Sequence, residues 1–169
     1  MVDNFNEKAD FIWSIADLLR GDYKQSEYQK VVLPLTVLRR LDCVTARNKD
    51  DVLERYEQLR NQGIENVAPS LKKAADAEVY NTSEYTFETL CNDPDDIAEN
   101  LRYYINQYDE ETTEIFEKFD FDHQIRRLDD ADLLYKVVRQ FAEIDLHPDA
   151  VANEEMGYIY EELIRKFNE

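Results

Sequence analysis

The sequence predicts a single all-α domain, an irregular bundle of about seven or eight helices. Only three Gly and four Pro occur among 169 residues, which leaves little turn chemistry for a multi-stranded sheet. Hydrophobic residues make up 43% of the chain and aromatic residues 12%, enough for a real core rather than a disordered acidic tail. In most segments the apolar residues recur every three or four positions, as on one face of a helix.

The first helix is expected to run from Asn4 or Asn6, either of which can cap it, to about Leu19. Gly21 follows as a stop. The inward stripe of this helix consists of Phe5, Ala9, Ile12, Trp13, Ala16 and Leu19.

The second helix is expected to be the most buried, because its apolar residues surround much of its circumference. Ser26 and Gln29 have the form of a capping box at its start, and the helix extends to about Arg47. Pro34 should kink it or break it near Val31. The apolar positions are Val31, Val32, Leu33, Leu35, Val37, Leu38, Leu41 and Val44.

The middle of the chain is less regular. A third helix opens at Asp50 or Asp51 and stops at Gly63, and residues 69–77 predict a short helix. Apolar and aromatic residues on both sides of 81–83 predict one small β-hairpin near 79–87.

Helical patterns return after Asp93, which with Pro94 forms a strong helix start. A further helix and a turn are expected over 115–128, and Asp129 or Asp130 should cap the next helix. Asn153 should cap the last helix. The inner stripes are Ile97, Leu101, Tyr104, Ile105 and Tyr108, then Ile115, Phe116 and Phe119, then Phe121, Ile125 and Leu128, then Ala131, Leu134, Val137, Val138 and Phe141, and finally Met156, Ile159, Tyr160, Leu163 and Phe167.

The charge balance is strongly acidic: 20 basic against 38 acidic residues give a formal charge of −18. A negative surface field of this size repels phosphates, so unaided binding of nucleic acid is not expected. The basic residues nevertheless form one candidate positive edge near 20–40. Its members, and the candidate contacts to DNA phosphates, are Arg20, Lys24, Lys30, Arg39 and Arg40.

The sequence carries no recognisable motif for catalysis, cofactors or metals, and we expect no catalytic, cofactor-binding or metal-binding residue in this chain. Cys43 and Cys91 are isolated cysteines, and His123 and His147 are too far apart to suggest a zinc site. The pair Asp120-x-Asp122 lacks the glycine that a calcium loop requires at its sixth position. No glycine-rich phosphate loop occurs.

Two long blocks carry a resemblance to a known family. Residues 13–21 read W-x-x-A-D-x-L-R-G, and residues 28–41 read Y-x-x-x-x-L-P-L-x-x-L-x-R-L. Together and at this spacing they resemble the opening of the DNA-methylating (M) subunits of type I restriction–modification systems. Residues 119–146 resemble the second half of that N-terminal domain, and residues 156–167 resemble the helix that leads into the catalytic domain.

The resemblance implies an accessory role for residues 1–169 as a single N-terminal helical domain. In the family, a following Rossmann-like domain uses S-adenosylmethionine to methylate adenine at N6, and a specificity (S) subunit reads the DNA. The domain would help subunit assembly with that core, the S subunit and a second M subunit, and closure around DNA. The four prolines follow Leu33, Ala68, Asp93 and His147, so the Asn-Pro-Pro motif of the catalytic domain is absent. We therefore expect that domain after Glu169.

Two alternatives come from the composition alone. The acidic charge also suits a free-standing acidic protein-binding module or DNA mimic, and the carboxylate clusters leave open a small enzyme of unrecognised type. No apolar run reaches the length of a membrane span, and no signal-peptide pattern opens the chain. We expect a cytoplasmic protein with no membrane partner.

Overall fold

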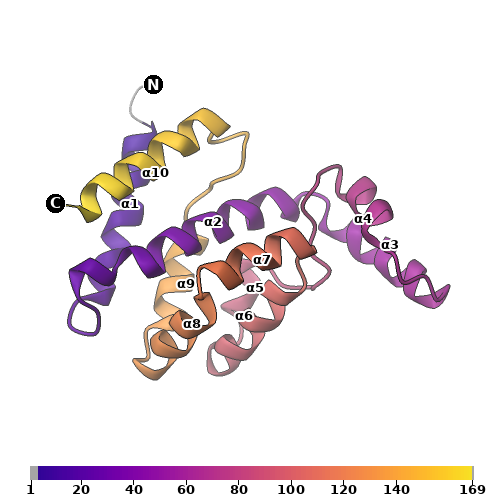
Figure 1. Ribbon diagram of the computed structural model, residues 1–169, viewed down its shortest axis with the longest axis horizontal. Coiled ribbons are helices and arrows are strands. Elements are labelled where there is room, and N and C mark those ends of the chain that lie inside the picture. The colour runs from indigo at the N-terminus through magenta and orange to yellow at the C-terminus, as the bar shows by residue number, and fades with distance from the viewer. Residues whose placement is uncertain (1–3, 169) are drawn as a thin grey trace.

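The computed structural model describes residues 4–168, and side chains from Asn6 onward. This part of the chain is all-α, as predicted, with ten α-helices and three short 3-10 helices (Figure 1). In chain order they are α1 (Asn4–Ile15), η1 (Ala16–Leu19), η2 (Gln25–Glu27), α2 (Gln29–Ala46), α3 (Lys49–Asn61), α4 (Ala68–Ala75), α5 (Phe87–Leu90), η3 (Pro94–Asp96), α6 (Ile97–Asn106), α7 (Glu110–Lys118), α8 (Phe121–Asp130), α9 (Leu134–Ala142) and α10 (Asn153–Phe167). The capping role expected of Asn4 and the core role expected of Phe5 lie outside the described side chains.

Helix α2 is the central element, as its apolar pattern predicted. It packs against α1, α8, α9 and α10 and runs through the middle of the molecule (Figure 1). The break expected near Val31 does not occur, because Pro34 lies in the second turn of one continuous helix. The carbonyl that loses its hydrogen bond there belongs to the exposed Lys30, where water can replace the missing donor. The buried residues of α2 are Val31, Val32, Pro34, Leu35, Thr36, Leu38, Arg39, Arg40, Asp42 and Thr45.

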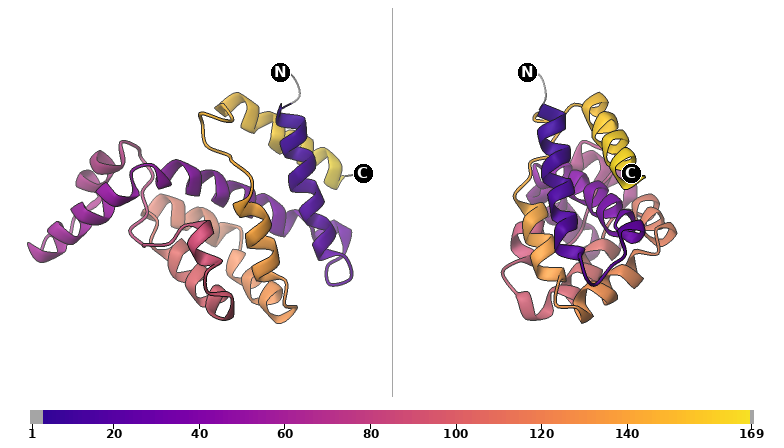
Figure 2. Two further views of the ribbon diagram at one scale, coloured as in Figure 1. Left: turned by 180° about the vertical axis from the view of Figure 1, so that it is seen from behind. Right: turned by 90° about the vertical axis from the view of Figure 1, so that its left-hand side faces the viewer.

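The two ends of the chain close one end of the bundle. Helix α10 lies along α1, and Figure 2 shows the pair from two further sides. The Trp13 and Phe167 rings lie 5.1 Å apart, and Lys166 contacts both the Trp13 ring and the Asp10 carboxylate. The N-terminal and C-terminal helices are therefore part of one core.

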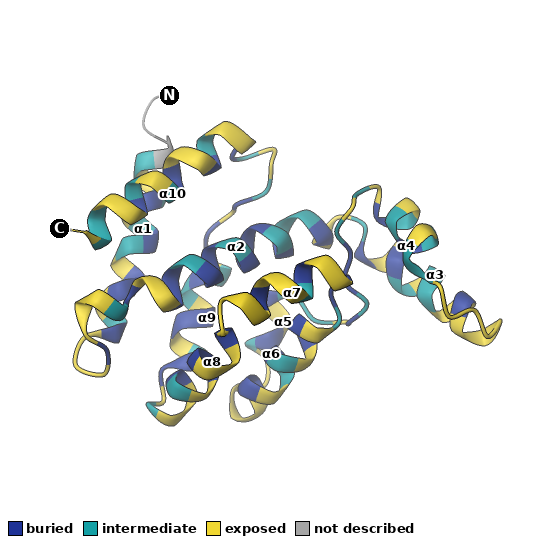
Figure 3. Cartoon of the chain, in the orientation of Figure 1, coloured by how far each residue is buried: buried dark blue, intermediate teal, exposed yellow. Residues whose placement is uncertain are grey.

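Helices α3 and α4 form an arm that projects from the opposite end of the molecule (Figures 1 and 2). They enclose a small core of their own, separate from the main one, made of Val52, Leu59, Leu71, Ala75 and Tyr80. Both helices occur near their predicted positions, although α3 begins at Lys49 and ends at Asn61, and α4 ends at Ala75. Gly63 reverses the chain between them at a φ of 71°. Figure 3 shows its outer faces exposed and its inner faces buried.

The predicted hairpin near 79–87 is wrong, since the described residues contain no strand. Asn81 instead makes an isolated antiparallel bridge with Tyr108, far along the chain. Residues beyond it form the four-residue helix α5, whose first turn is capped by the Thr86 hydroxyl accepting from the Thr89 amide at 3.2 Å.

Predicted helix starts are also corrected. Asn153 is the first residue of α10, and the N-cap position belongs to Ala152. The Ser26–Gln29 capping box is not formed; the Glu27 carboxylate instead accepts from the Lys24 amide one turn earlier, at 2.9 Å. Asp129 and Asp130 end α8 rather than cap α9, because Asp132 adopts a left-handed conformation with a φ of 61° and reverses the chain there.

No helix among residues 4–168 combines the length and apolar character needed to cross a membrane.

Candidate functional site

Three of the five candidate phosphate-binding residues lie on the surface. Arg20, Lys24 and Lys30 are exposed around the turn between η1 and the start of α2. The guanidinium of Arg20 pairs with Asp17 at 3.2 Å but leaves 78% of its side chain exposed. These three cations are accessible to an anion, and their contact with phosphate stays a prediction. We call these three residues the N-edge.

Arg127 of α8 contacts the turn beside the N-edge. The guanidinium stacks over the Tyr23 ring at 3.9 Å and donates to the Glu27 carboxylate at 2.9 and 3.3 Å and to the Asp22 carbonyl at 2.8 Å. The hydrogen bond from Arg127 lowers the pKa of Glu27 to about 2. The Tyr23 hydroxyl adds a bond to Gln124 at 2.9 Å. These contacts tie the turn between η1 and α2 to α8.

Arg39 is a correction to the predicted edge, because it is buried and its donors are used inside the fold. Its side chain donates to the Ile144 carbonyl at 2.8 Å, to the Ala142 carbonyl at 3.0 Å and to the Asp42 carboxylate at 2.9 Å. The two carbonyls lie at the C-terminal end of α9, where helices leave acceptors unsatisfied. Arg39 therefore anchors α9 to α2.

Arg40 is the second correction, for the same reason. It is 9% exposed and donates to the Leu146 carbonyl at 2.7 Å, the Val151 carbonyl at 2.5 Å and the Asn153 side chain at 2.7 Å. Burial lowers the pKa of its guanidinium. Arg40 fixes the connection between α9 and α10. Because the donors of Arg39 and Arg40 are used inside the fold, neither residue belongs to the N-edge.

Asp42 is the centre of a buried polar network that sequence reasoning missed. Its carboxylate accepts from the Tyr104 hydroxyl at 2.7 Å and from the Phe87 amide at 3.2 Å, in addition to Arg39. Its burial raises the pKa of the carboxyl. The Tyr104 hydroxyl also lies 2.5 Å from that of Tyr108. A carboxylate at the first turn of α5 satisfies an orphan amide and positions that short helix.

Lys49 completes the network at the base of the α3–α4 arm. Its ammonium donates to the Asn81 side chain at 3.3 Å and lies 5.9 Å from the centre of the Tyr104 ring. Burial lowers its pKa to about 8. The signal for this network was a repeat of polar residues at helical spacing on the otherwise apolar α2, continued at Lys49: Arg39, Asp42, Thr45 and Lys49.

A pocket of about 390 Å³ opens beside Asp42, with Arg39, Cys43, Arg47 and His147 in its wall. Burial raises the pKa of the Cys43 thiol, which disfavours the reactive thiolate. Arg47 pairs with Asp149 across the exposed side. Among the described residues no three His, Cys, Asp or Glu side chains form a group that could hold a metal ion.

The fold and these contacts define an all-helical domain in which the buried charges of α2 hold distant segments in place. A family model described as HsdM N-terminal domain matches residues 8–141. The chain belongs to this family, the N-terminal domain of the M subunit of type I restriction–modification methyltransferases. No curated protein matches the sequence.

Proposed function

We propose that this chain is an accessory, non-catalytic domain of an adenine-specific DNA methyltransferase, acting in subunit assembly and in closure around DNA. The observation that carries the proposal is the family match over residues 8–141. The parent enzyme would transfer the methyl group of S-adenosylmethionine to N6 of adenine through a catalytic domain placed after Glu169. The proposed setting is the cytoplasm, where cellular DNA is methylated.

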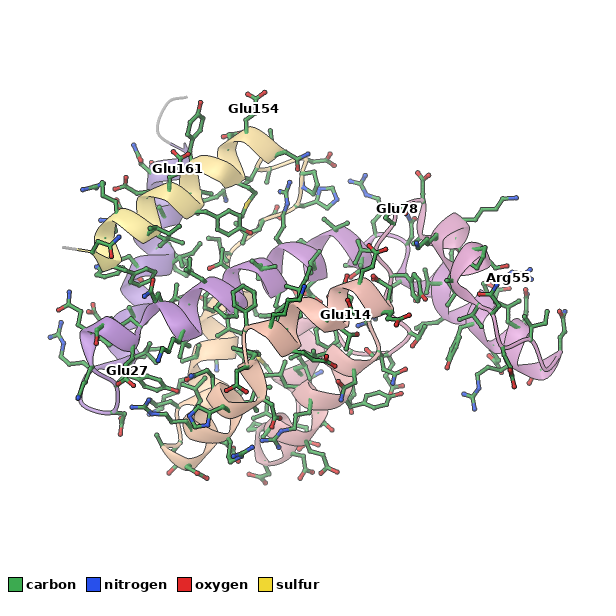
Figure 4. The ribbon with its side chains drawn as sticks, in the orientation of Figure 1. Glu27, Arg55, Glu78, Glu114, Glu154 and Glu161 are labelled. Atoms are coloured by element: carbon green, nitrogen blue, oxygen red, sulfur yellow. The ribbon has the colours of Figure 1, made fainter. Side chains whose placement is uncertain are left out.

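The proposed partners are that catalytic domain, the S subunit, a second M subunit and, through the assembled complex, DNA. A formal charge of −18 favours protein surfaces of opposite charge. Figure 4 shows this charge on the outside of α10, where Glu154 and Glu161 point away from the bundle. Most of the phosphate affinity would then come from other parts of the enzyme.

The N-edge is the proposed place of any direct contact with DNA. Arg20, Lys24 and Lys30 are exposed around a turn that Arg127 bonds to α8, and these bonds would reduce the ordering of the backbone that binding a phosphate requires. The contact would position the duplex and carry no sequence information, as phosphate contacts do.

Calorimetry tests the proposal. A tagged 169-residue chain is mixed with the catalytic domain and the S subunit of the same system, and binding is measured by calorimetry. We expect association with these proteins and no heat on titration with S-adenosylmethionine. Tight cofactor binding by this chain, or no association with either protein, would contradict the proposal.

One alternative keeps support from a specific observation. The charge of −18 also suits a DNA mimic that occupies a basic groove of another protein. Salt-sensitive capture of a nuclease by the chain, with no association with methyltransferase subunits, would favour this second function.

A further inference from the structure

A groove opens between α6, α7 and α8, and we call it the α6–α8 groove. Its volume is about 270 Å³. The floor is apolar and half aromatic, with Ile105, Phe116, Phe121 and Ile125 each at most 7% exposed. The Phe116 and Phe121 rings lie 6.2 Å apart and are tilted at 56°. The groove therefore offers a preformed apolar surface at the base of a recess.

The rim of this groove is acidic. Glu117, Asp120 and Asp122 contribute three carboxylates against the single guanidinium of Arg102. Arg102 donates to Asp122 at 2.7 Å, so its charge is already paired. The hydrogen bonds and ion pairs found among the described residues leave the exposed Glu117 and Asp120 carboxylates available to a partner.

Size and charge together restrict what the groove can hold. Small-molecule sites usually measure roughly 300–1,000 Å³, so this recess suits one large side chain better than a ligand of drug size. An acidic rim repels the phosphates of nucleic acid and attracts Lys and Arg. An apolar floor with charged edges is also the arrangement that receives an amphipathic helix.

We propose that the α6–α8 groove docks a basic segment of a protein partner. One large apolar side chain of that segment inserts over the Phe116 and Phe121 rings, and neighbouring Lys or Arg residues pair with Glu117 and Asp120. This inference deepens the proposed assembly role and rests on it, because it names the chemistry of a partner surface.

Nuclear magnetic resonance titration of the 169-residue chain tests the groove directly. The probe is a peptide of sequence KKLLRKLLK, and the comparison peptide is EELLEELLE. We expect saturable shifts of the Ile105 and Ile125 methyl signals with the basic peptide and none with the acidic one. Absence of saturable shifts with the basic peptide would overturn the inference.

Charge reversal on the rim gives the sharper test. The double variant Glu117→Lys with Asp120→Asn should weaken binding at least tenfold; asparagine is chosen because Asp120 has a φ of 53°, where lysine would be strained. The matched control, Glu154→Lys with Glu161→Gln, makes the same change of net charge on α10 and should alter binding less than twofold. Equal weakening by both pairs would show a non-specific charge effect and would overturn the inference.

A third variant separates the apolar recess from the charge. Asn106 is exposed and lines the groove, so Asn106→Trp should fill the recess at unchanged charge and abolish the methyl shifts. Retained native affinity for the basic peptide in this variant would rule out insertion of an apolar side chain.

Failure of the peptide to bind while the chain still associates with its subunits rejects the proposal for the groove alone. Peptide binding without subunit association rejects the proposed function instead.

Discussion

The Arg40 guanidinium donates a hydrogen bond to the Val151 carbonyl, 111 residues further along the chain. This bond joins the central helix to the connection that leads into α10. Residues of the second family-like block thus hold the fold together, since Arg39 and Arg40 both reach segments more than a hundred residues away.

Replacing Arg40 should destabilise the domain strongly. Arg40→Met leaves two buried carbonyls and the Asn153 side chain without their donor, which should cost about 3 kcal/mol. Arg20→Met, at an exposed site, should change stability by less than about 0.5 kcal/mol. Urea unfolding followed by circular dichroism measures both, and similar values for the two variants would contradict the buried role of Arg40.

The pair of Glu27 and Arg127 should contribute to stability only above acidic pH. The folded pKa of Glu27, about 2, lies below its ordinary value of 4.5. The unfolded chain therefore binds the proton more tightly, and the stabilisation is lost as pH falls from 4.5 toward 2. Glu27→Gln should lose less stability than the native chain over this range.

Unfolding measured at closely spaced pH values checks this expectation. Glu161→Gln, a change at an exposed carboxylate of α10, serves as the control and should follow the native pH profile. An unchanged profile in Glu27→Gln would show that the ion pair with Arg127 does not form.

Lys49 should give a second rise of stability with pH, in the alkaline range. Its pKa is lowered from 10.5 to about 8, so between these values the unfolded chain binds more protons than the folded one. Stability should therefore rise with pH across that window, by an amount on the order of 3 kcal/mol. The rise is measured as the difference between the native chain and Lys49→Met, because titrating tyrosines contribute equally to both. A flat difference would contradict the buried position of Lys49.

Neutralising the N-edge should weaken DNA binding by the assembled methyltransferase without affecting the fold. The triple variant Arg20→Gln, Lys24→Gln and Lys30→Gln removes three exposed cations. If each contacts one phosphate, the slope of log affinity against log salt should fall by about 3. Fluorescence anisotropy at several salt concentrations measures the slope.

A matched triple variant controls for net charge. Lys73→Gln, Lys118→Gln and Lys136→Gln removes the same charge at exposed sites elsewhere and should leave the slope nearly unchanged. Equal effects of the two triple variants would remove the N-edge as a DNA contact.

The sequence predicted the fold class, the central helix and the α3–α4 pair, because long amphipathic or apolar segments have clear periodicity. The prediction that Arg39 and Arg40 lie on the surface was wrong because α2 is buried on almost every side. Adjacent residues can then both be buried, and a basic pair cannot be assigned to the surface from spacing alone.

The short elements were not predicted from the sequence, for a different reason. Helix α5 has four residues, too few for a periodic signal, and depends on Thr86 and Asp42 for its start. The hairpin was expected because local residues favour extended backbone, whereas the partner of Asn81 is the distant Tyr108. The α6–α8 groove likewise depends on the packing of three helices and has no local pattern.

The α3–α4 arm should unfold locally before the rest of the domain does, because its core is separate from the main one. The arm has only a few buried apolar side chains of its own, and it is joined to the rest through polar contacts such as that of Lys49 with Asn81. Opening of this unit should require less free energy than global unfolding. In heavy water the backbone amides of the arm should exchange faster than those of α2, whose exchange requires global unfolding of the domain.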